Sequence, residues 1–163
     1  MSNIVTLDFE TYYAKDFSLS KITTEEYIND PRFQVIGVGI KVDDGETTWH
    51  TGADVKTALD KIDWSNASLL CHNTMFDGAI LAWRYGIVPY FYLDTLSMAR
   101  AIHGVDAGGS LKALAIRYNI GEKGDEVINA LGKRLDDFSA IDLDNYGRYC
   151  RNDVDLTRSL FGI

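Results

Sequence analysis

Apolar and polar residues in the first third of the chain follow the period of two that is typical of β-strands. Residues 4–10, 33–42 and 46–49 are rich in apolar and β-branched side chains, and we expect each of them to form a strand. A turn ending at Gly45 separates the last two and favours a hairpin, because glycine readily adopts the positive φ of a tight turn. A polar stretch, residues 11–32, separates the first two strands. The chain therefore opens with a three-stranded antiparallel meander.

The period then changes, and short apolar strands alternate with stretches of helical spacing. Strands are expected at residues 67–71 and 90–93. Helical spacing of apolar residues is found at residues 55–62, 74–85, 111–118, 127–135 and 143–161. Strands that alternate with helices pair in parallel through right-handed crossovers. The sequence therefore predicts an α/β fold with a mixed sheet, in which an antiparallel meander is followed by βα units and flanked by helices.

The composition is that of one ordinary globular domain. The chain has 163 residues, of which 46% are hydrophobic and 25% charged, and we expect a single domain over residues 1–163. With 16 Lys and Arg against 24 Asp and Glu, the formal charge of −8 argues against a simple electrostatic clamp on DNA. The excess of acid belongs either to the surface or to a site that holds cations.

The cysteine content and the N-terminus bear on the cellular compartment. The two cysteines, Cys71 and Cys150, form no C-x-x-C pair, which excludes a disulfide framework and a zinc ribbon. The sequence shows neither a signal-peptide pattern nor an apolar stretch of transmembrane length. We therefore expect a reducing, cytoplasmic compartment and no membrane partner.

Three carboxylates lie at the ends of predicted elements. Asp8 and Glu10 stand two residues apart near the end of the first strand, so they share the face opposite its apolar residues. Asp77 falls in the first turn of the helix at 74–85, where the helix dipole alone favours a carboxylate. Asn73, just before this helix, is a favourable N-cap residue. Each feature taken alone has an ordinary structural explanation, either a solvated strand end or a favourable helix start.

The last helix gives a sharper signal. Its apolar residues form one stripe when each residue advances by about 100°, and Asp153 lies within that stripe. An ionised carboxylate buried there without a partner would be costly, so Asp153 should be paired or should bind a metal ion. Tyr149 lies one turn earlier on the same face. A structural hydrogen bond between Tyr149 and Asp153 is the alternative to a metal site.

Together these residues match three motifs of a known family. The sequence D-F-E-T at residues 8–11 resembles the first motif of the DEDD 3′–5′ exonucleases, D-x-E-T. N-T-M-F-D at 73–77 resembles their second motif, N-x-x-[FY]-D, and Y-C-R-N-D at 149–153 resembles the third, Y-x-x-x-D. The chain is similar in particular to the proofreading exonuclease domain of family A DNA polymerases, of the bacterial polymerase I and phage type. Arg148 stands where another branch of the family carries a histidine, so the resemblance is to the tyrosine branch.

The resemblance implies the ribonuclease H-like (DnaQ-like exonuclease) fold and two divalent cations, Mg²⁺ or Mn²⁺. It implies that the cations are held by Asp8, Glu10, Asp77 and Asp153, with Asp8 bridging both. Tyr149 is expected to be catalytic together with these four acids, because its phenol would orient the attacking water. The residues expected to contact the substrate are Phe9, Thr11, His72, Asn73 and Phe76.

The implied substrate is a single-stranded or frayed 3′ end of DNA, and the implied role is proofreading during DNA replication. The chain would then be the N-terminal part of a longer DNA polymerase, with the polymerase domain as a partner in cis, in the cytoplasm of a bacterium or a phage-infected cell. Six basic residues of the second half either line the path of the strand or form solvated helix surface: Arg100, Lys112, Arg117, Lys123, Lys133 and Arg134.

Two alternatives keep the fold and change the function. The chain is either an exoribonuclease of the ribonuclease D type or a non-catalytic module that only binds single strands or a partner protein. The presence of all four acids and Tyr149 argues against the non-catalytic module.

Overall fold

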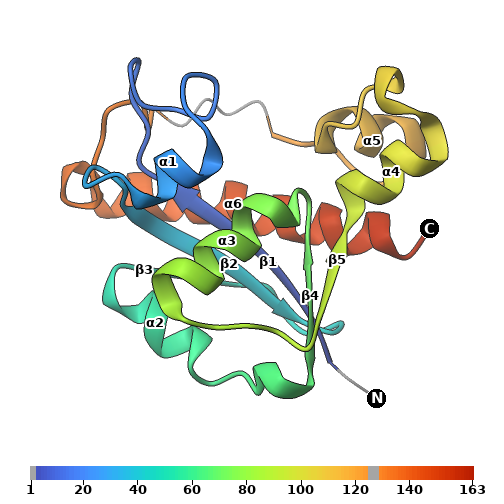
Figure 1. Cartoon of the computed structure of the whole chain (residues 1–163), viewed down its shortest axis with the longest axis horizontal. Coiled ribbons are helices and arrows are strands. Elements are labelled where there is room, and N and C mark those ends of the chain that lie inside the picture. Colours follow the sequence, from blue (N-terminus) through green and yellow to red (C-terminus); the bar gives the residue numbers. More distant parts are fainter. Residues whose placement is uncertain (1–2, 125–128) are drawn as a thin grey trace.

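The computed structural model describes residues 3–124 and 129–163. Its centre is a five-stranded mixed sheet with the strand order β3-β2-β1-β4-β5 (Figure 1). The strands are β1 (Asn3–Thr11), β2 (Val35–Val42), β3 (Thr48–Thr51), β4 (Ala67–Cys71) and β5 (Phe91–Asp94). β2 pairs antiparallel with β1 and with β3, whereas β4 pairs parallel with β1 and with β5. The prediction of a mixed sheet, with a meander followed by βα units, is confirmed.

Helices cover both faces of this sheet. They are α1 (Thr24–Asn29), α2 (Ala53–Leu59), α3 (Thr74–Tyr85), α4 (Thr95–His103), α5 (Leu111–Tyr118) and α6 (Ala140–Phe161), with short 3₁₀ helices at Trp64–Asn66, Val105–Ala107 and Leu135–Asp137. α1, α2 and α3 pack on one face, α6 crosses the other, and α4 and α5 lie together at one end (Figure 1). Within the part of the chain that the structure describes, no helix is long and apolar enough to cross a membrane.

The alternation predicted for the first strand is confirmed. Val5, Leu7 and Phe9 are buried in the core that α3 covers. Asp8 and Glu10 lie on the other face of β1, where both contact side chains of α6. β1 therefore carries its apolar residues to the core and its carboxylates to the layer between the sheet and α6.

The apolar stripe predicted for the last helix is also confirmed. α6 buries Tyr146, Cys150, Val154 and Thr157 against the sheet, and Asp153 is buried with them. The helix begins at Ala140, a few residues before the predicted start, because the Ser139 hydroxyl caps it by accepting a hydrogen bond from a backbone N–H.

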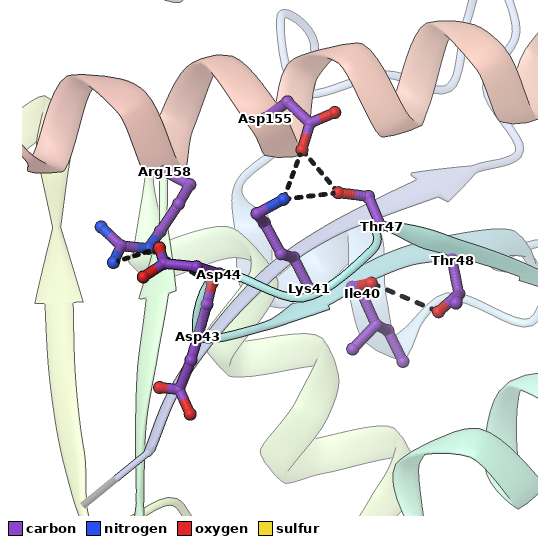
Figure 2. Close-up of polar contacts among 8 residues, drawn as sticks. All are labelled: Ile40, Lys41, Asp43, Asp44, Thr47, Thr48, Asp155 and Arg158. Carbon is purple, nitrogen blue, oxygen red and sulfur yellow. Dashed lines mark hydrogen bonds and ion pairs between the residues drawn. The ribbon is translucent and has the colours of Figure 1, made fainter.

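The polar side of α6 is tied to the hairpin between β2 and β3 (Figure 2). Asp155 accepts hydrogen bonds from Lys41 Nζ at 3.1 Å and from Thr47 Oγ1 at 2.5 Å. One turn later, Arg158 donates to Asp44 at 2.9 Å. These contacts join α6 to the antiparallel half of the sheet.

The polar stretch at 11–32 contains a helix that the sequence pattern does not reveal. α1 has six residues, which is too short for an apolar period to be recognised, and it depends on its cap. The Thr23 hydroxyl accepts from Glu26 N at 3.2 Å, and the Glu26 carboxylate accepts from Thr23 N at 2.9 Å. This reciprocal capping box holds the helix start. β3 likewise begins at Thr48, two residues later than predicted.

The prediction of a helix at 127–135 is wrong for residues 129–135, the part of this range that the structure describes. Residues 125–128 lie outside the described chain, and residues 129–134 form no helix, with only a 3₁₀ turn at Leu135–Asp137. Gly132 adopts φ +74°, which interrupts a right-handed helix. Its N–H donates instead to the Tyr13 carbonyl at 2.8 Å, so this segment packs as a loop.

Candidate metal centre

Four carboxylates from three separate elements lie together, with Asp8 as the common neighbour of the other three. Asp8 and Glu10 lie near the end of β1, Asp77 in the first turn of α3 and Asp153 on α6. A carboxylate oxygen of Asp8, one of Glu10 and the Cys150 sulfur lie within 4.8 Å of one another. Electrostatic repulsion links Asp8 to each of the other three carboxylates. The structure thus brings together the four acids that the sequence analysis selected.

Burial and mutual repulsion oppose the ionisation of these acids. Burial, followed by the charge of Asp153, raises the pKa of Asp8 from 3.8 to about 7. Burial and then the charge of Asp8 raise the pKa of both Glu10 and Asp77. Burial also raises the pKa of Asp153, although Lys123 acts in the opposite direction. The cluster therefore needs added positive charge to be fully ionised at neutral pH.

Asp77 connects the start of α3 to β1. Its carboxylate is almost fully buried, and its Oδ1 accepts a hydrogen bond from the backbone N–H of Phe9 at 2.9 Å. Phe9 is the residue between Asp8 and Glu10, so this bond fixes α3 relative to both strand acids. Asn73 is the N-cap residue of α3, as expected, but with φ 91° its side chain makes no capping hydrogen bond among the described residues.

One carboxylate oxygen of Asp153 accepts a hydrogen bond, and the other has no hydrogen-bond partner among the described residues. Its Oδ2 accepts from Lys123 Nζ at 2.6 Å. Its Oδ1 is buried and has no hydrogen-bond partner among the described residues. A buried acceptor without a donor costs about 1–3 kcal/mol. This oxygen is therefore available to a ligand.

The donor set fits a hard divalent cation. Carboxylate oxygens are the ligands that Mg²⁺ and Mn²⁺ prefer, and the cluster supplies four carboxylates, one of which has the free oxygen Asp153 Oδ1. Cys150 lies beside them, but burial raises the pKa of its thiol, so the sulfur stays protonated. Its Sγ donates instead towards the backbone oxygen of Asp8 at 3.4 Å.

Two residues of this centre were not identified from the sequence. Tyr146 hydrogen-bonds Glu10, and burial raises the pKa of the phenol, so it stays protonated and donates to the carboxylate. Tyr146 lies three and seven residues before Tyr149 and Asp153 on the buried face of α6, where its sequence position does not distinguish it from a core residue. Lys123 had been placed among six scattered basic residues, and no local pattern marks it out.

A cleft of about 420 Å³ opens beside the cluster. It is lined by residues that include Asp8, Asp153, Lys123, Arg100, His72 and Asn73. The His72 ring is held by Thr95 Oγ1 at 2.8 Å and by the Gly109 carbonyl at 2.9 Å. Two of the predicted substrate contacts and two of the six predicted basic residues thus lie in the cleft wall.

The other three predicted substrate contacts do not line this cleft. Phe9 is buried in the core and stacks on Tyr85 with ring centroids 5.8 Å apart. Phe76 packs against the same core, and Thr11 Oγ1 shares a hydrogen bond of 2.9 Å with the Tyr27 hydroxyl. Their side chains support the site from the α3 side of the sheet.

Three of the other four basic residues make local contacts. Arg117 donates to the Ala107 carbonyl at 2.6 Å. Lys133 and Arg134 lie over the rings of Phe138 and Tyr12. For these three residues the structure shows local contacts and no place in the cleft wall.

Comparison with known proteins shows the fold. No protein-family model and no curated protein matches the chain. Among solved structures, NrnC of Brucella melitensis with bound Mg²⁺ matches at a TM-score of 0.67 and 16% identity, covering 98% of this chain and 70% of that one. Trypanosoma brucei RNase D matches at 0.71 and 16%, covering 99% and 57%. The family B DNA polymerase of Pyrobaculum calidifontis matches at 0.68 and 16%, covering 99% and 24%.

These similarities confirm the ribonuclease H-like exonuclease fold predicted from the sequence. The narrower resemblance to family A polymerases stays a prediction.

Proposed function

We propose that this chain is a 3′–5′ exonuclease that uses two divalent cations, Mg²⁺ or Mn²⁺, held by the four acids of the candidate metal centre. The observation that carries this proposal is the convergence of carboxylates from β1, α3 and α6 on Asp8, next to a cleft. A buried cluster of acids with raised pKa values is costly to the fold and is typical of a functional site. The solved structures of the same fold include NrnC of Brucella melitensis with bound Mg²⁺ and the apo form of a nuclease.

Each acid has a distinct position in the proposed mechanism. Cations bound at this centre would supply an activated water and would neutralise the charge that develops on the phosphate. Asp8 is the common neighbour of the other three acids, which supports its assignment as the shared ligand. Asp77 keeps the carboxylates of β1 aligned through its bond to Phe9 N.

Tyr149 is proposed to orient the attacking water. Its half-buried phenol lies one turn before Asp153 on α6. Burial, followed by the charge of Asp153, raises the pKa of the phenol above its usual value of 10. Tyr149 therefore remains protonated at neutral pH and positions a water by hydrogen bonding, because a phenol with such a pKa is a poor general base.

For the substrate we propose the single-stranded or frayed 3′ end of DNA, on the basis of the three motifs shared with proofreading domains. We further propose that residues 1–163 act in proofreading during replication, beside a polymerase domain in cis, in the cytoplasm of a bacterium or a phage-infected cell. The second candidate is an exoribonuclease. It is favoured by the similarity to RNase D and to NrnC, which has been solved with pGG bound.

The test is hydrolysis of a 5′-labelled single-stranded DNA oligonucleotide, with an RNA of the same sequence in parallel. We expect a ladder that shortens from the 3′ end with Mg²⁺ or Mn²⁺ and disappears with EDTA or with D8A/E10A. The ratio of DNA to RNA rates decides between the two substrates.

Two substitutions on α6 distinguish the loss of a metal ligand from the mere loss of a negative charge. Asp153→Asn should abolish cleavage, whereas Asp144→Asn should retain it, because the Asp144 side chain is 68% exposed and pairs only weakly with Arg148 at 3.6 Å. If the folded wild type binds metal but cleaves neither strand, the exonuclease proposal is wrong.

A further inference from the structure

Lys123 places an ammonium group within the acidic cluster. It lies in the segment between α5 and α6, and its Nζ is 2.6 Å from Asp153 Oδ2. The same Nζ lies 5.3 Å from the centre of the Tyr149 ring. The side chains of Lys123 and Asp153 are only 26% and 8% exposed. This contact is therefore enclosed, unlike the exposed ion pairs elsewhere on the molecule.

The ammonium acts on more than its direct partner. Its charge lowers the pKa of Asp8, Glu10 and Asp153, in opposition to burial. Burial would lower the pKa of Lys123 itself, but the hydrogen bond and the charge of Asp153 raise it above its usual value, so Lys123 remains a cation. One positive charge thus offsets part of the repulsion among the carboxylates.

This position conflicts with a divalent cation. Mg²⁺ requires ligand oxygens at about 2.0–2.1 Å, and Asp153 Oδ2 is already engaged by the ammonium. Two cations at one carboxylate oxygen repel each other, and the enclosed site screens that repulsion only weakly. Asp153 can offer both oxygens to a metal only after Lys123 has moved away.

We propose, on the basis of the proposed metal centre, that Lys123 is an internal counter-ion, and that a divalent cation displaces it when Asp153 binds the cation through both of its oxygens. The exchange breaks one N–H···O contact and forms one metal–oxygen contact. Lys123 therefore stabilises the metal-free protein and at the same time weakens its affinity for metal.

The first test is calorimetric titration of the full chain with Mn²⁺. Lys123→Met removes the competing ammonium and should tighten binding about 10–100-fold, the range that corresponds to one hydrogen bond to a charged group. Lys56→Met is the matched control, because it removes the same charge from an exposed ion pair with Asp60 on α2. Lys56→Met should bind as the wild type does, and Lys123→Arg, which keeps the cation, should bind no more tightly than the wild type.

The result that overturns the proposal is a Lys123→Met affinity equal to or weaker than that of the wild type. That outcome leaves the metal centre and the proposed function intact. If no protein in the series binds Mn²⁺, the metal centre itself is wrong, and the proposed function fails together with the role of Lys123.

A second measurement uses the wild type and does not depend on the folding of a variant. Lysine acylation with an N-hydroxysuccinimide ester, read by peptide mass spectrometry, reports how accessible each ammonium is. We expect Mn²⁺ to raise the acylation rate of Lys123 several-fold and to leave that of Lys56 unchanged. An unchanged rate at Lys123 in protein that binds Mn²⁺ would refute the displacement.

Discussion

Gly39 determines how closely α6 approaches the sheet, and Gly39→Ala is the sharpest test of this packing. Gly39 lies on β2 directly opposite Asp8 in the strand register. A Cβ atom there would lie 2.8 Å from Val154 Cγ2 and 2.9 Å from Cys150 Sγ. The nearest favourable separation of carbon atoms is about 3.5 Å. The added methyl group must therefore push α6 outward or force its side chains into other rotamers.

The expected cost follows from two opposing effects. Overpacking of this kind destabilises by about 1–3 kcal/mol, whereas replacing a strand glycine by alanine stabilises by about 0.5–1 kcal/mol. We therefore expect a net loss of up to about 2.5 kcal/mol, which for a chain of this size lowers the Tm by up to about 10 °C.

Gly39→Ala should also weaken metal binding at the candidate centre. Cys150 and Val154 flank Asp153 on α6, so moving them moves Asp153 away from Asp8. Disturbing the support of metal ligands typically weakens affinity about 10–100-fold, and we expect a loss in this range for Mn²⁺. The assay is thermal unfolding in EDTA together with calorimetric titration.

Gly162→Ala provides the control, because Gly162 has φ −81° and its added Cβ would make only an ordinary 3.4 Å contact with the Ser159 carbonyl. It should leave both the Tm and the Mn²⁺ affinity unchanged. If Gly39→Ala raises the Tm, or lowers it without weakening Mn²⁺ binding, the argument that this glycine positions Asp153 against Asp8 is wrong.

Three further predictions concern the chemistry of the centre. Tyr146→Phe removes the hydrogen bond to Glu10 and should weaken Mn²⁺ binding, as measured by calorimetry. Tyr149→Phe removes the hydroxyl that orients the water and should lower kcat about 100-fold with unchanged Mn²⁺ affinity. The opposite pattern would mean that Tyr146 positions the water and Tyr149 supports the metal ligands. Burial and the charge of Asp153 raise the pKa of Asp8 to about 7, so between about pH 4 and 7 the folded state binds more protons than the unfolded state. The stability of the protein in EDTA should therefore fall as the pH rises through this window, and a Tm that rises there would contradict the assignment. Adding Mg²⁺ at pH 8 should restore the Tm, because the cation replaces the lost protons.

The sequence by itself determined which residues face which layer. The alternation of β1 separated Asp8 and Glu10 from Val5, Leu7 and Phe9, and the structure confirms this separation. The period of the last helix placed Asp153 in a buried stripe, which is also confirmed. These properties follow from backbone geometry, because a strand repeats every two residues and a helix about every 3.6.

The periodic pattern of apolar residues did not predict the backbone where only a few residues determine its conformation. α1 depends on the cap between Thr23 and Glu26, and the loop around Gly132 depends on a single left-handed residue and its bond to Tyr13. Neither feature produces a period that can be read over several turns.

Only the tertiary structure decided which side chains meet across the layers. Lys123 is 30 residues from Asp153 in the sequence, and Tyr146 is farther still from Glu10, so neither pairing has a local signature. Phe9 is predicted to contact the substrate, but its side chain packs in the core against Tyr85. Only its backbone N–H contributes to the site, because it donates a hydrogen bond to Asp77 Oδ1. Such contacts depend on the height and register at which α6 and α3 pack on the sheet. Those are set by long-range packing, including the close approach at Gly39, and not by the residues on either side of a motif.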